Sequence, residues 1–472
     1  GLARDDEHGV KSWGYGGDYE RETDPNSGNF CCNGIVSPDG SPKPAMWTCK
    51  YVYQPIEFTM LDKEGLRIGL KNRNFHRSTE GYVYSWEIKD EDGLIQSGVM
   101  DVPVMAPGES VEVTINAKKM SFKSGAVYML NLYSKESAAL PYAAPGHCHS
   151  SEQVVLNERV QPETPSAKGK APVIAESDEE VCIKAGKVTV TVDKETGYLT
   201  GYHDGVQQML KAPFAPNFWR AEIDNDWRGW KPAHYMPYWK SAQQTFASAP
   251  VDMETVADNG AVVVKVSKKM EDRAVLTMSY VVYPDGLLRV DYKITISEGT
   301  LEPLRIGLQG QVDGDYEKVT YFGRGPQENY SDRYDGIFLG TWDTSAAGMM
   351  FNYVYPQENG NRTSVRWILM TDLQGRGIQF LGVEPLSVSV WNTTQEEIQK
   401  ARHIGEPQML RDAFTINVDH VQTGVGGTDS WSQSARPSDQ YRLMDKNYSY
   451  SFYIRPVKSR SDAISAGRRL CR

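Results

Sequence analysis

The chain has 472 residues, of which 51 are basic and 61 acidic, so its formal net charge at pH 7 is -10. This acidic balance argues against nucleic acid or an anionic membrane as the main partner. No apolar run approaches the roughly 18 residues needed to cross a bilayer, so we expect a soluble protein without a membrane partner. At about 100 to 200 residues per domain, the length predicts about three domains.

The first fifty residues are rich in Gly, Asn, Asp and Pro around the aromatic residues Trp13, Tyr15, Tyr19 and Phe30. This composition is typical of loops gathered at a surface and not of a self-sufficient core. The chain also starts at Gly1 without a charged and apolar leader. We therefore expect this segment to be the tail of a larger domain, and the cellular compartment stays open.

Short β-rich runs follow at the spacing of a sandwich, and Asp92-Gly93 marks a hairpin turn between two of them. The runs are Leu66 to Leu70, Tyr82 to Ile88, Val111 to Ile115 and Val127 to Leu132. Together they predict an immunoglobulin-like module of about 100 residues. A segment rich in Pro, Gly and polar residues then predicts an interdomain linker from Asn157 to Ser177.

Beyond Val181 the pattern again predicts strands, with Pro284-Asp285-Gly286 as the tight turn of a long hairpin. The predicted strands are Val188 to Val192, Val262 to Val266, Leu276 to Tyr283, Leu288 to Ile296, Ile378 to Val383 and Ser387 to Val390. Only Thr394 to Arg402 and Ser461 to Arg469 are predicted to be helical. The region is therefore expected to be a large twisted β-sandwich.

Five motifs, spread from near the start to near the end of the chain, point to one family. They are Tyr-Gly-Gly-Asp from Tyr15 to Asp18, Asn-Phe-Cys-Cys-Asn-Gly from Asn29 to Gly34, Gly-Arg-Gly-Pro-Gln-Glu-Asn-Tyr-Ser-Asp-Arg from Gly323 to Arg333, Tyr-Pro-Gln-Glu-Asn-Gly from Tyr355 to Gly360, and Gly-Gly-Thr-Asp-Ser-Trp-Ser from Gly426 to Ser432. Their order and content resemble the C-terminal part of the large bacterial β-galactosidases of glycoside hydrolase family 2. The resemblance covers nearly the whole chain.

The resemblance implies a mainly β protein with three domains. Residues 1–52 would be the end of a catalytic (β/α)8 barrel, residues 53–156 an immunoglobulin-like sandwich, residues 157–178 a linker, and residues 179–472 a galactose-mutarotase-like β-supersandwich. The implied partners are a galactoside substrate and an N-terminal catalytic portion on the same or a separate chain. The full enzyme is expected to be a homo-oligomer in the bacterial cytoplasm or periplasm.

A retaining glycosidase needs two carboxyl groups about 5 to 5.5 Å apart. The resemblance places both catalytic glutamates on barrel strands whose motifs are absent here, so we assign no catalytic residue and expect the chain alone to be inactive. Acidic residues in predicted loops have the alternative role of bonding turns. They are Glu222, Asp224, Asp226, Glu328, Asp332 and Asp429.

The resemblance implies that Trp431 and Asn33 contribute to substrate binding, Trp431 by stacking its indole against the sugar. Gly424, Gly426 and Gly427 would let the backbone turn sharply enough to present that indole. The alternative from the residues alone is that Trp431 anchors a loop against a core.

The resemblance also implies a sodium ion held by the Phe30 carbonyl and the Asn33 amide oxygen, and a magnesium position at Asn26. Oxygen ligands suit both hard cations. Without the resemblance, Asn33-Gly34 reads as a turn. The adjacent pair Cys31-Cys32 and the bulky Trp227-Arg228-Gly-Trp230 depart from the family pattern, and the second of these departures leaves the aglycone preference open.

Two other function classes stay open. One is a non-catalytic carbohydrate-binding and assembly module, because the aromatic residues with a predicted sugar contact lie in loops on β scaffolds. The other is aldose 1-epimerisation, which needs a general acid and a general base; His203, His234, His403 and His420 are available for it. The six cysteines lack metal-ligand spacing, and His147-Cys-His149 is expected to be a loop and not a metal site.

Overall fold

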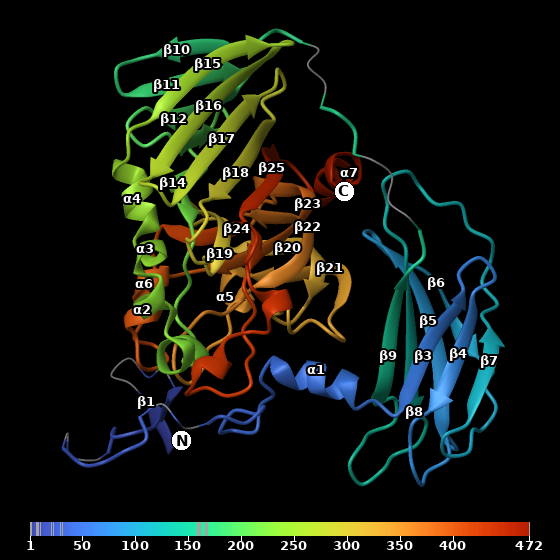
Figure 1. Ribbon diagram of the computed structural model, residues 1–472. Helices are drawn as coiled ribbons and strands as arrows, with labels where there is room; N and C mark the ends of the chain where they lie inside the picture. Colours follow the sequence, from blue (N-terminus) through green and yellow to red (C-terminus); the bar gives the residue numbers. More distant parts are fainter. Residues whose placement is uncertain are drawn as a thin grey trace. The chain divides into compact units, whose positions relative to one another are not determined.

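The computed structural model describes residues 2–5, 9, 11–19, 21, 23–28, 30, 32–157, 162–165 and 169–471. The chain divides into two compact units (Figure 1). Unit 1 comprises residues 1–41, 162–333 and 342–472, and unit 2 comprises residues 42–161 with 334–341. Most of the described chain outside the loops is strand, which confirms the predicted mainly β fold class.

Unit 2 is a sandwich of two antiparallel sheets. One sheet has the order β3-β4-β7, formed by Ile56–Asp62, Arg67–Asn72 and Ser110–Thr114. The other has the order β6-β5-β8-β9, formed by Gly93–Met100, Tyr82–Asp90, Met129–Glu136 and Cys148–Val155. Alternate residues of β5 are buried, and they include Tyr84, Trp86 and Ile88. The predicted hairpin turn is confirmed, because β5 ends at Asp90 and β6 begins at Gly93. Helix α1, Ala45–Val52, precedes the first strand of the sandwich.

Unit 1 is built around one extended, curled sheet (Figure 1). Its main path runs through β10 (Val173–Glu176), β11 (Glu180–Ala185), β12 (Val188–Asp193), β13 (Leu199–His203), β14 (Leu210–Asn217), β19 (Arg305–Asp313), β24 (Ala413–Gln422), β23 (Gly377–Trp391), β25 (Asn447–Val457), β18 (Leu288–Ile296), β17 (Ala274–Val282), β16 (Ala261–Met270) and β15 (Asp252–Asp258). Strands β20 (Lys318–Gly325), β21 (Phe338–Ser345) and β22 (Arg362–Thr371) branch from it. Strand β10 lies inside the segment predicted to be a linker.

The long hairpin predicted around Pro284-Asp285-Gly286 is confirmed by the pairing of β17 with β18. Alternate residues of β17 are buried, with Leu276, Met278 and Tyr280 almost fully inaccessible. This period-2 pattern is the signal from which the strand was predicted. The core of unit 1 therefore lies along one face of the hairpin.

One strand in unit 1 is longer than predicted. Residues 378–383 and 387–390 were expected as two strands, but both belong to β23, Gly377–Trp391. The pairing with β22 shifts register where Val365 faces Leu386 and Trp367 faces Leu381. Pro385 is exposed at this irregularity, which is where a strand tolerates proline.

The two predicted helices are confirmed by α6 (Gln395–Lys400) and α7 (Arg460–Leu470). The prediction that this region has only those two is wrong. A series of short helical segments follows β14, namely η1 (Asn225–Trp230), α2 (Pro232–Tyr235), α3 (Pro237–Lys240) and α4 (Ala242–Ser248) (Figure 1). Buried Met236, Trp239 and Phe246 recur at helical spacing and face the core. Further short turns are α5 (Ala346–Met349), η2 (Gln433–Ala435) and η3 (Asp439–Tyr441).

The N-terminal segment belongs to unit 1. Its β1 (Leu2–Asp5) and β2 (Lys11–Gly14) pair as an antiparallel hairpin, and the described residues from Tyr15 to Pro44 are mainly turns and loops. Among the helices in the described ranges, we find none with the length and apolar character of a membrane span.

Candidate functional site

The loop after β24 presents Trp431 at the surface of unit 1. The Asp429 carboxylate accepts hydrogen bonds from the backbone N–H groups of Trp431, at 3.1 Å, and Ser432, at 2.9 Å. It also accepts from the Ser432 hydroxyl, and these bonds hold the pKa of Asp429 below its ordinary value. The closed turn leaves the Trp431 side chain 70% exposed. Trp431 is thus not a core anchor within the described chain.

The glycines before Trp431 are required by close packing and not by a left-handed backbone, since none of the three has a positive φ. A Cβ on Gly427 would lie 2.2 Å from the Ala435 carbonyl oxygen. A Cβ on Gly424 would lie 2.4 Å from Asp332 Oδ2. The predicted role of glycine in shaping this loop therefore has a different physical reason, namely the absence of space for a side chain.

Phe30 and Trp431 are brought together, although 400 residues separate them in sequence. Their ring centroids lie 6.4 Å apart with an interplanar angle of 75°, an edge-to-face arrangement. Phe30 is 54% exposed, so both rings border solvent. Asn33 is exposed as well. Of the predicted substrate and ion residues, the structure thus brings Phe30 and Trp431 together.

Contacts with the 402–406 loop hold the N-terminal segment in place. His403 Nε2 lies 2.8 Å from Asp18 Oδ2, and His403 Nδ1 lies 2.7 Å from Glu406 Oε1. The Tyr15 hydroxyl donates to the Arg402 carbonyl, and its ring packs on His403 with centroids 5.0 Å apart. Burial raises the pKa of Tyr15 well above its ordinary value, so the phenol stays a donor.

A second set of contacts joins this segment to η1. Arg228 donates to the Ser27 carbonyl oxygen at 3.2 Å and lies over the Trp227 ring. Trp227 in turn stacks on Tyr355 with ring centroids 5.8 Å apart. Arg228 therefore connects η1 to the N-terminal segment, and Trp227 connects η1 to Tyr355.

The predicted ion ligands differ in how well they suit a cation. The Asn33 amide makes no hydrogen bond within the described chain, and the Phe30 carbonyl accepts no backbone hydrogen bond there. Both are oxygen donors suited to a hard cation, although two oxygens alone do not complete its shell. Asn26 Oδ1 already accepts from Gly28 N at 2.9 Å, which leaves one lone pair. Asn29 and Cys31 of the same motif lie outside the described residues.

The described residues hold no cluster of three or more His, Cys, Asp or Glu side chains with metal-binding geometry. His147 and His149 instead pack edge to face, and His149 Nε2 lies 3.1 Å from Glu136 Oε2. This pairing gives His149 a structural role in the sandwich of unit 2.

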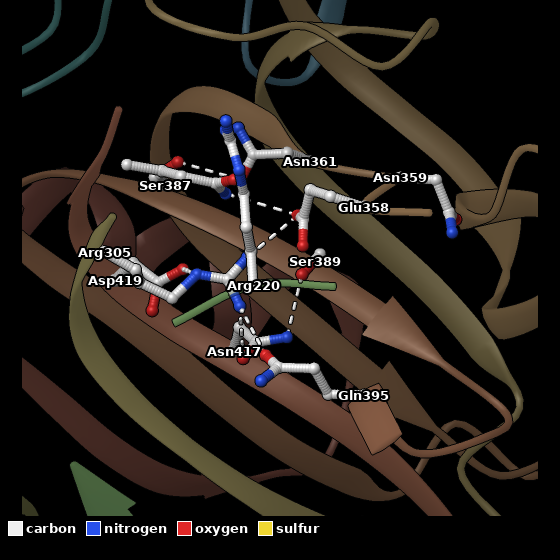
Figure 2. A network of polar contacts seen from close by, with 12 residues as sticks. Arg220, Arg305, Glu358, Asn359, Asn361, Ser387, Ser389, Gln395, Asn417 and Asp419 are labelled. Atoms are coloured by element: carbon white, nitrogen blue, oxygen red, sulfur yellow. Dashed lines mark hydrogen bonds and ion pairs between the residues drawn. The ribbon is translucent and has the colours of Figure 1, made fainter. Parts of the chain in front are cut away.

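A buried polar network lies between the strands of unit 1 (Figure 2). Arg220 is fully buried and makes two hydrogen bonds to Asp226, at 2.8 and 2.9 Å. The same guanidinium donates to the carbonyl oxygens of Thr423, at 3.2 Å, and Gly424, at 3.1 Å. Arg220 therefore ties the start of η1 to the base of the loop that carries Trp431.

Arg305 is the centre of the second half of the network. Its guanidinium lies 2.8 Å from Glu358 Oε1 and 3.2 Å from Asp419 Oδ2, and all three side chains are buried (Figure 2). One guanidinium thus faces two buried carboxyl groups. Burial raises the pKa of Glu358, and it raises the pKa of Asp419 from 3.8 to about 8 against the opposing effect of Arg305. Burial therefore favours the protonated form of Asp419.

The acidic loop residues considered as candidates all have hydrogen-bond or ion-pair partners in unit 1. Glu222 faces Lys240, Asp224 accepts from Gln357, Asp226 pairs with Arg220, Glu328 accepts from Arg333, Asp332 accepts from Gly426 N, and Asp429 closes the Trp431 turn. Asp226 and Asp429 bond N–H groups of their own turns, whereas Glu222, Asp224 and Asp332 contact residues distant in sequence.

Sequence reasoning missed the Arg220 and Arg305 networks. Arg305 and Asp419 occupy paired strands, where alternation with apolar residues reads as an exposed face. The available signal was the charge of Arg220 between apolar neighbours, in the short stretch from Phe218 to Ala221.

Family models match three successive parts of the chain. The model described as beta galactosidase small chain matches residues 184–454, beta-galactosidase domain 4 matches residues 68–157, and the TIM barrel domain of glycosyl hydrolases family 2 matches residues 2–58. The last match agrees with the expected barrel remnant.

Two curated relatives, both named beta-galactosidase, align along almost the whole chain. The protein from Halalkalibacterium halodurans is 31% identical over 464 residues, covering 97% of this chain and 44% of that protein. The one from Priestia megaterium is 28% identical over 454 residues, covering 96% of this chain and 43% of that protein. The chain thus spans less than half the length of these relatives.

Among solved structures, a putative aldose 1-epimerase from Escherichia coli K12 aligns with a TM-score of 0.33 and 9% identity, covering 61% of this chain and 99% of that one. These values are too low to carry an argument. The small-chain model, in contrast, matches more than half of the residues. The chain therefore belongs to the β-galactosidase small-chain family, as the C-terminal part of a glycoside hydrolase family 2 protein.

Proposed function

We propose that this chain is the C-terminal portion of a β-galactosidase that hydrolyses terminal non-reducing β-D-galactose residues with retention of configuration. The observation that carries the proposal is the edge-to-face pair of Phe30 and Trp431, two exposed rings 6.4 Å apart. They come from two motifs at opposite ends of the chain. Their meeting on one surface is what a shared sugar site requires.

In this proposal the chain binds and orients the sugar, and a portion outside this sequence supplies the two glutamates. The Trp431 indole offers an apolar face to the C–H side of a pyranose. Asp429 fixes the backbone around it through the N–H groups of Trp431 and Ser432, so the turn that bears the indole is preorganised. A preorganised backbone lowers the entropy lost on sugar binding.

The Phe30 carbonyl and the Asn33 amide oxygen would hold a sodium ion, with the remaining ligands from outside this chain. The ion would supply a fixed positive charge beside a galactosyl hydroxyl. Asn26 would contribute one amide oxygen to a magnesium ion. The tie between Arg228 and Ser27 supports this role, because it holds the segment that bears these oxygens against η1.

The first test compares turnover of a nitrophenyl β-galactoside by the isolated chain and by the complete enzyme. We expect no turnover by the isolated chain. In the complete enzyme, Trp431→Ala should lower kcat/KM by about tenfold or more, the loss of one stacking contact and its buried area. Phe75→Ala is the matched control, since Phe75 is an 88% exposed aromatic residue of unit 2.

Two results would contradict the proposal. Turnover by the isolated chain that disappears in Trp431→Ala would place the catalytic acids within this sequence. An unchanged kcat/KM in the Trp431→Ala enzyme would remove the indole from the sugar site.

The ion assignment has its own test. The sodium concentration that gives half-maximal activity should rise in Asn33→Ala, with ionic strength kept constant by choline chloride. Asn74→Ala in unit 2 serves as the amide control. Equal sodium dependence in the Asn33→Ala variant and the unaltered enzyme would exclude Asn33 as a ligand.

A further inference from the structure

A hollow of about 600 Å³ lies beside the Trp431 loop in unit 1. Its walls come from the loop before Trp431, from the segment that contains η3, and from the end of the Gly323 to Arg333 motif. The lining residues that matter here are Asp332, Thr428, Arg436, Ser438, Asp439 and Tyr441. Trp431 is not among the residues that line it, so the indole is not part of its wall.

Hydrogen bonds donated by main-chain N–H groups keep the walls of the hollow in place. Thr428 N donates to the Ser434 carbonyl at 2.8 Å, and Gly426 N donates to Asp332 Oδ2 at 2.6 Å. Gly424 N donates to the Tyr441 carbonyl at 2.9 Å. The site is therefore preformed, and its volume falls in the range typical of small-molecule sites.

Polar side chains in the hollow are available to a ligand. Arg436 is exposed, and its guanidinium has no hydrogen-bond or ion-pair partner anywhere in the described ranges. The same is true of the Thr428 and Ser438 hydroxyls. A guanidinium supplies donors only, whereas hydroxyls both donate and accept. Tyr441 is an aromatic residue among those that line the hollow.

The charge of the hollow favours a neutral ligand. Asp439 already pairs with Arg442 at 2.7 Å, and the Asp332 carboxylate and the Arg436 guanidinium both line the hollow. An anion attracted by Arg436 would also meet the Asp332 carboxylate. A neutral molecule rich in hydroxyl groups meets no such repulsion.

We propose that this hollow is a second carbohydrate-binding site, for a neutral mono- or disaccharide held by Arg436, the Thr428 and Ser438 hydroxyls and the Tyr441 ring. The site goes beyond the proposed hydrolase function and does not depend on it. It shares the backbone from Gly426 to Thr428 with the Trp431 loop, so a bound sugar would contact the base of that loop.

The test is calorimetric titration of the 472-residue chain with galactose, lactose and inorganic phosphate as separate probes. We expect saturable binding of a sugar and none of phosphate. Binding should weaken by about tenfold in Arg436→Ala, the loss of one charged hydrogen bond, and less in Ser438→Ala. It should be unchanged in Arg411→Ala, the matched control, because Arg411 is also exposed and without a partner in the described part of the chain.

Trp431→Ala separates this site from the proposed substrate surface. Binding that survives in Trp431→Ala and is weakened in Arg436→Ala supports the second site. The inference is overturned by absence of saturation up to about 100 mM sugar, by binding that Arg436→Ala leaves unchanged, by equal loss in Trp431→Ala, or by Arg436-dependent binding of phosphate. None of these outcomes bears on turnover, so the hydrolase proposal stands or falls separately.

Discussion

The buried carboxyl of Asp419 should make the stability of unit 1 depend on pH. Asp419 is fully buried, and Arg305 Nε lies 3.2 Å from Asp419 Oδ2. Arg305 is shared with Glu358, whose negative charge opposes ionisation of Asp419. Burial is the largest effect and raises the pKa of Asp419, Arg305 lowers it, and Glu358 raises it further. The net result is a pKa raised from 3.8 to about 8. The folded protein therefore keeps a proton that the unfolded chain releases.

The sign follows from proton binding. Between pH 3.8 and about 8 the folded state binds one more proton than the unfolded state at Asp419, so the free energy of unfolding falls as the pH rises. The slope is about 1.4 kcal/mol per pH unit, and the loss over the whole interval is at most about 6 kcal/mol. Above about pH 8 the contribution is constant. Asp419→Asn removes it, because the amide is neutral at every pH.

The assay is urea unfolding at pH values from 5 to 9, followed by the fluorescence of buried residues such as Trp367 and Trp391. The difference in free energy of unfolding, Asp419→Asn minus the unaltered protein, should become more positive by about 1.4 kcal/mol per pH unit between pH 5 and 8. It should then level off. Asp315→Asn is the control at an exposed carboxylate and should give a flat difference.

A flat difference for Asp419→Asn between pH 5 and 8 would refute the reasoning. A second variant checks the cause. Glu358→Gln removes the negative charge that competes with Asp419 for Arg305. The pKa of Asp419 should therefore fall. In that background the pH-dependent difference should level off at a lower pH. An unchanged midpoint would show that Glu358 does not act on Asp419.

Two further predictions concern the Trp431 loop. Gly427→Ala should displace the loop, because its Cβ would lie 2.2 Å from the Ala435 carbonyl oxygen; a crystal structure of the variant with the loop unmoved would contradict this. Asp226→Asn should lower the free energy of unfolding by about 3 to 5 kcal/mol, since it leaves buried Arg220 without its ionic partner. Urea unfolding measures this loss. Lys265→Ala, at an exposed ion pair, is the control and should lower the free energy of unfolding by less than about 1 kcal/mol. A similar loss in both variants would contradict the prediction.

Much of the fold could be predicted from the local pattern. The strand prediction from Leu288 to Ile296 coincides with β18, because apolar residues alternate there and a Pro-Asp-Gly turn precedes it. The helices from Gln395 and from Arg460 were also predicted, and each begins after a hydroxyl residue that caps it, Thr394 or Ser459.

The missed features depend on partners distant in sequence. The short helices between Asn225 and Ser248 are each too brief to be stable alone, and their buried Trp239 and Phe246 need the sheet to cover them. In the sequence, Arg305 and Asp419 look like exposed strand residues. They are buried only when β19 and β24 pair and other segments of the same chain cover them. Local alternation cannot distinguish an exposed face from a buried polar layer.

By itself the sequence determined the family and the mainly β class, because motifs and alternation are local properties of the chain. The residues proposed for sugar and ion binding stay predictions. Only the tertiary structure decided that Phe30 meets Trp431, that Arg220 ties η1 to the Trp431 loop, and that Asp419 is buried beside Arg305. These are contacts between distant segments. Their energies depend on burial and packing, which exist only when the sheet of unit 1 has formed.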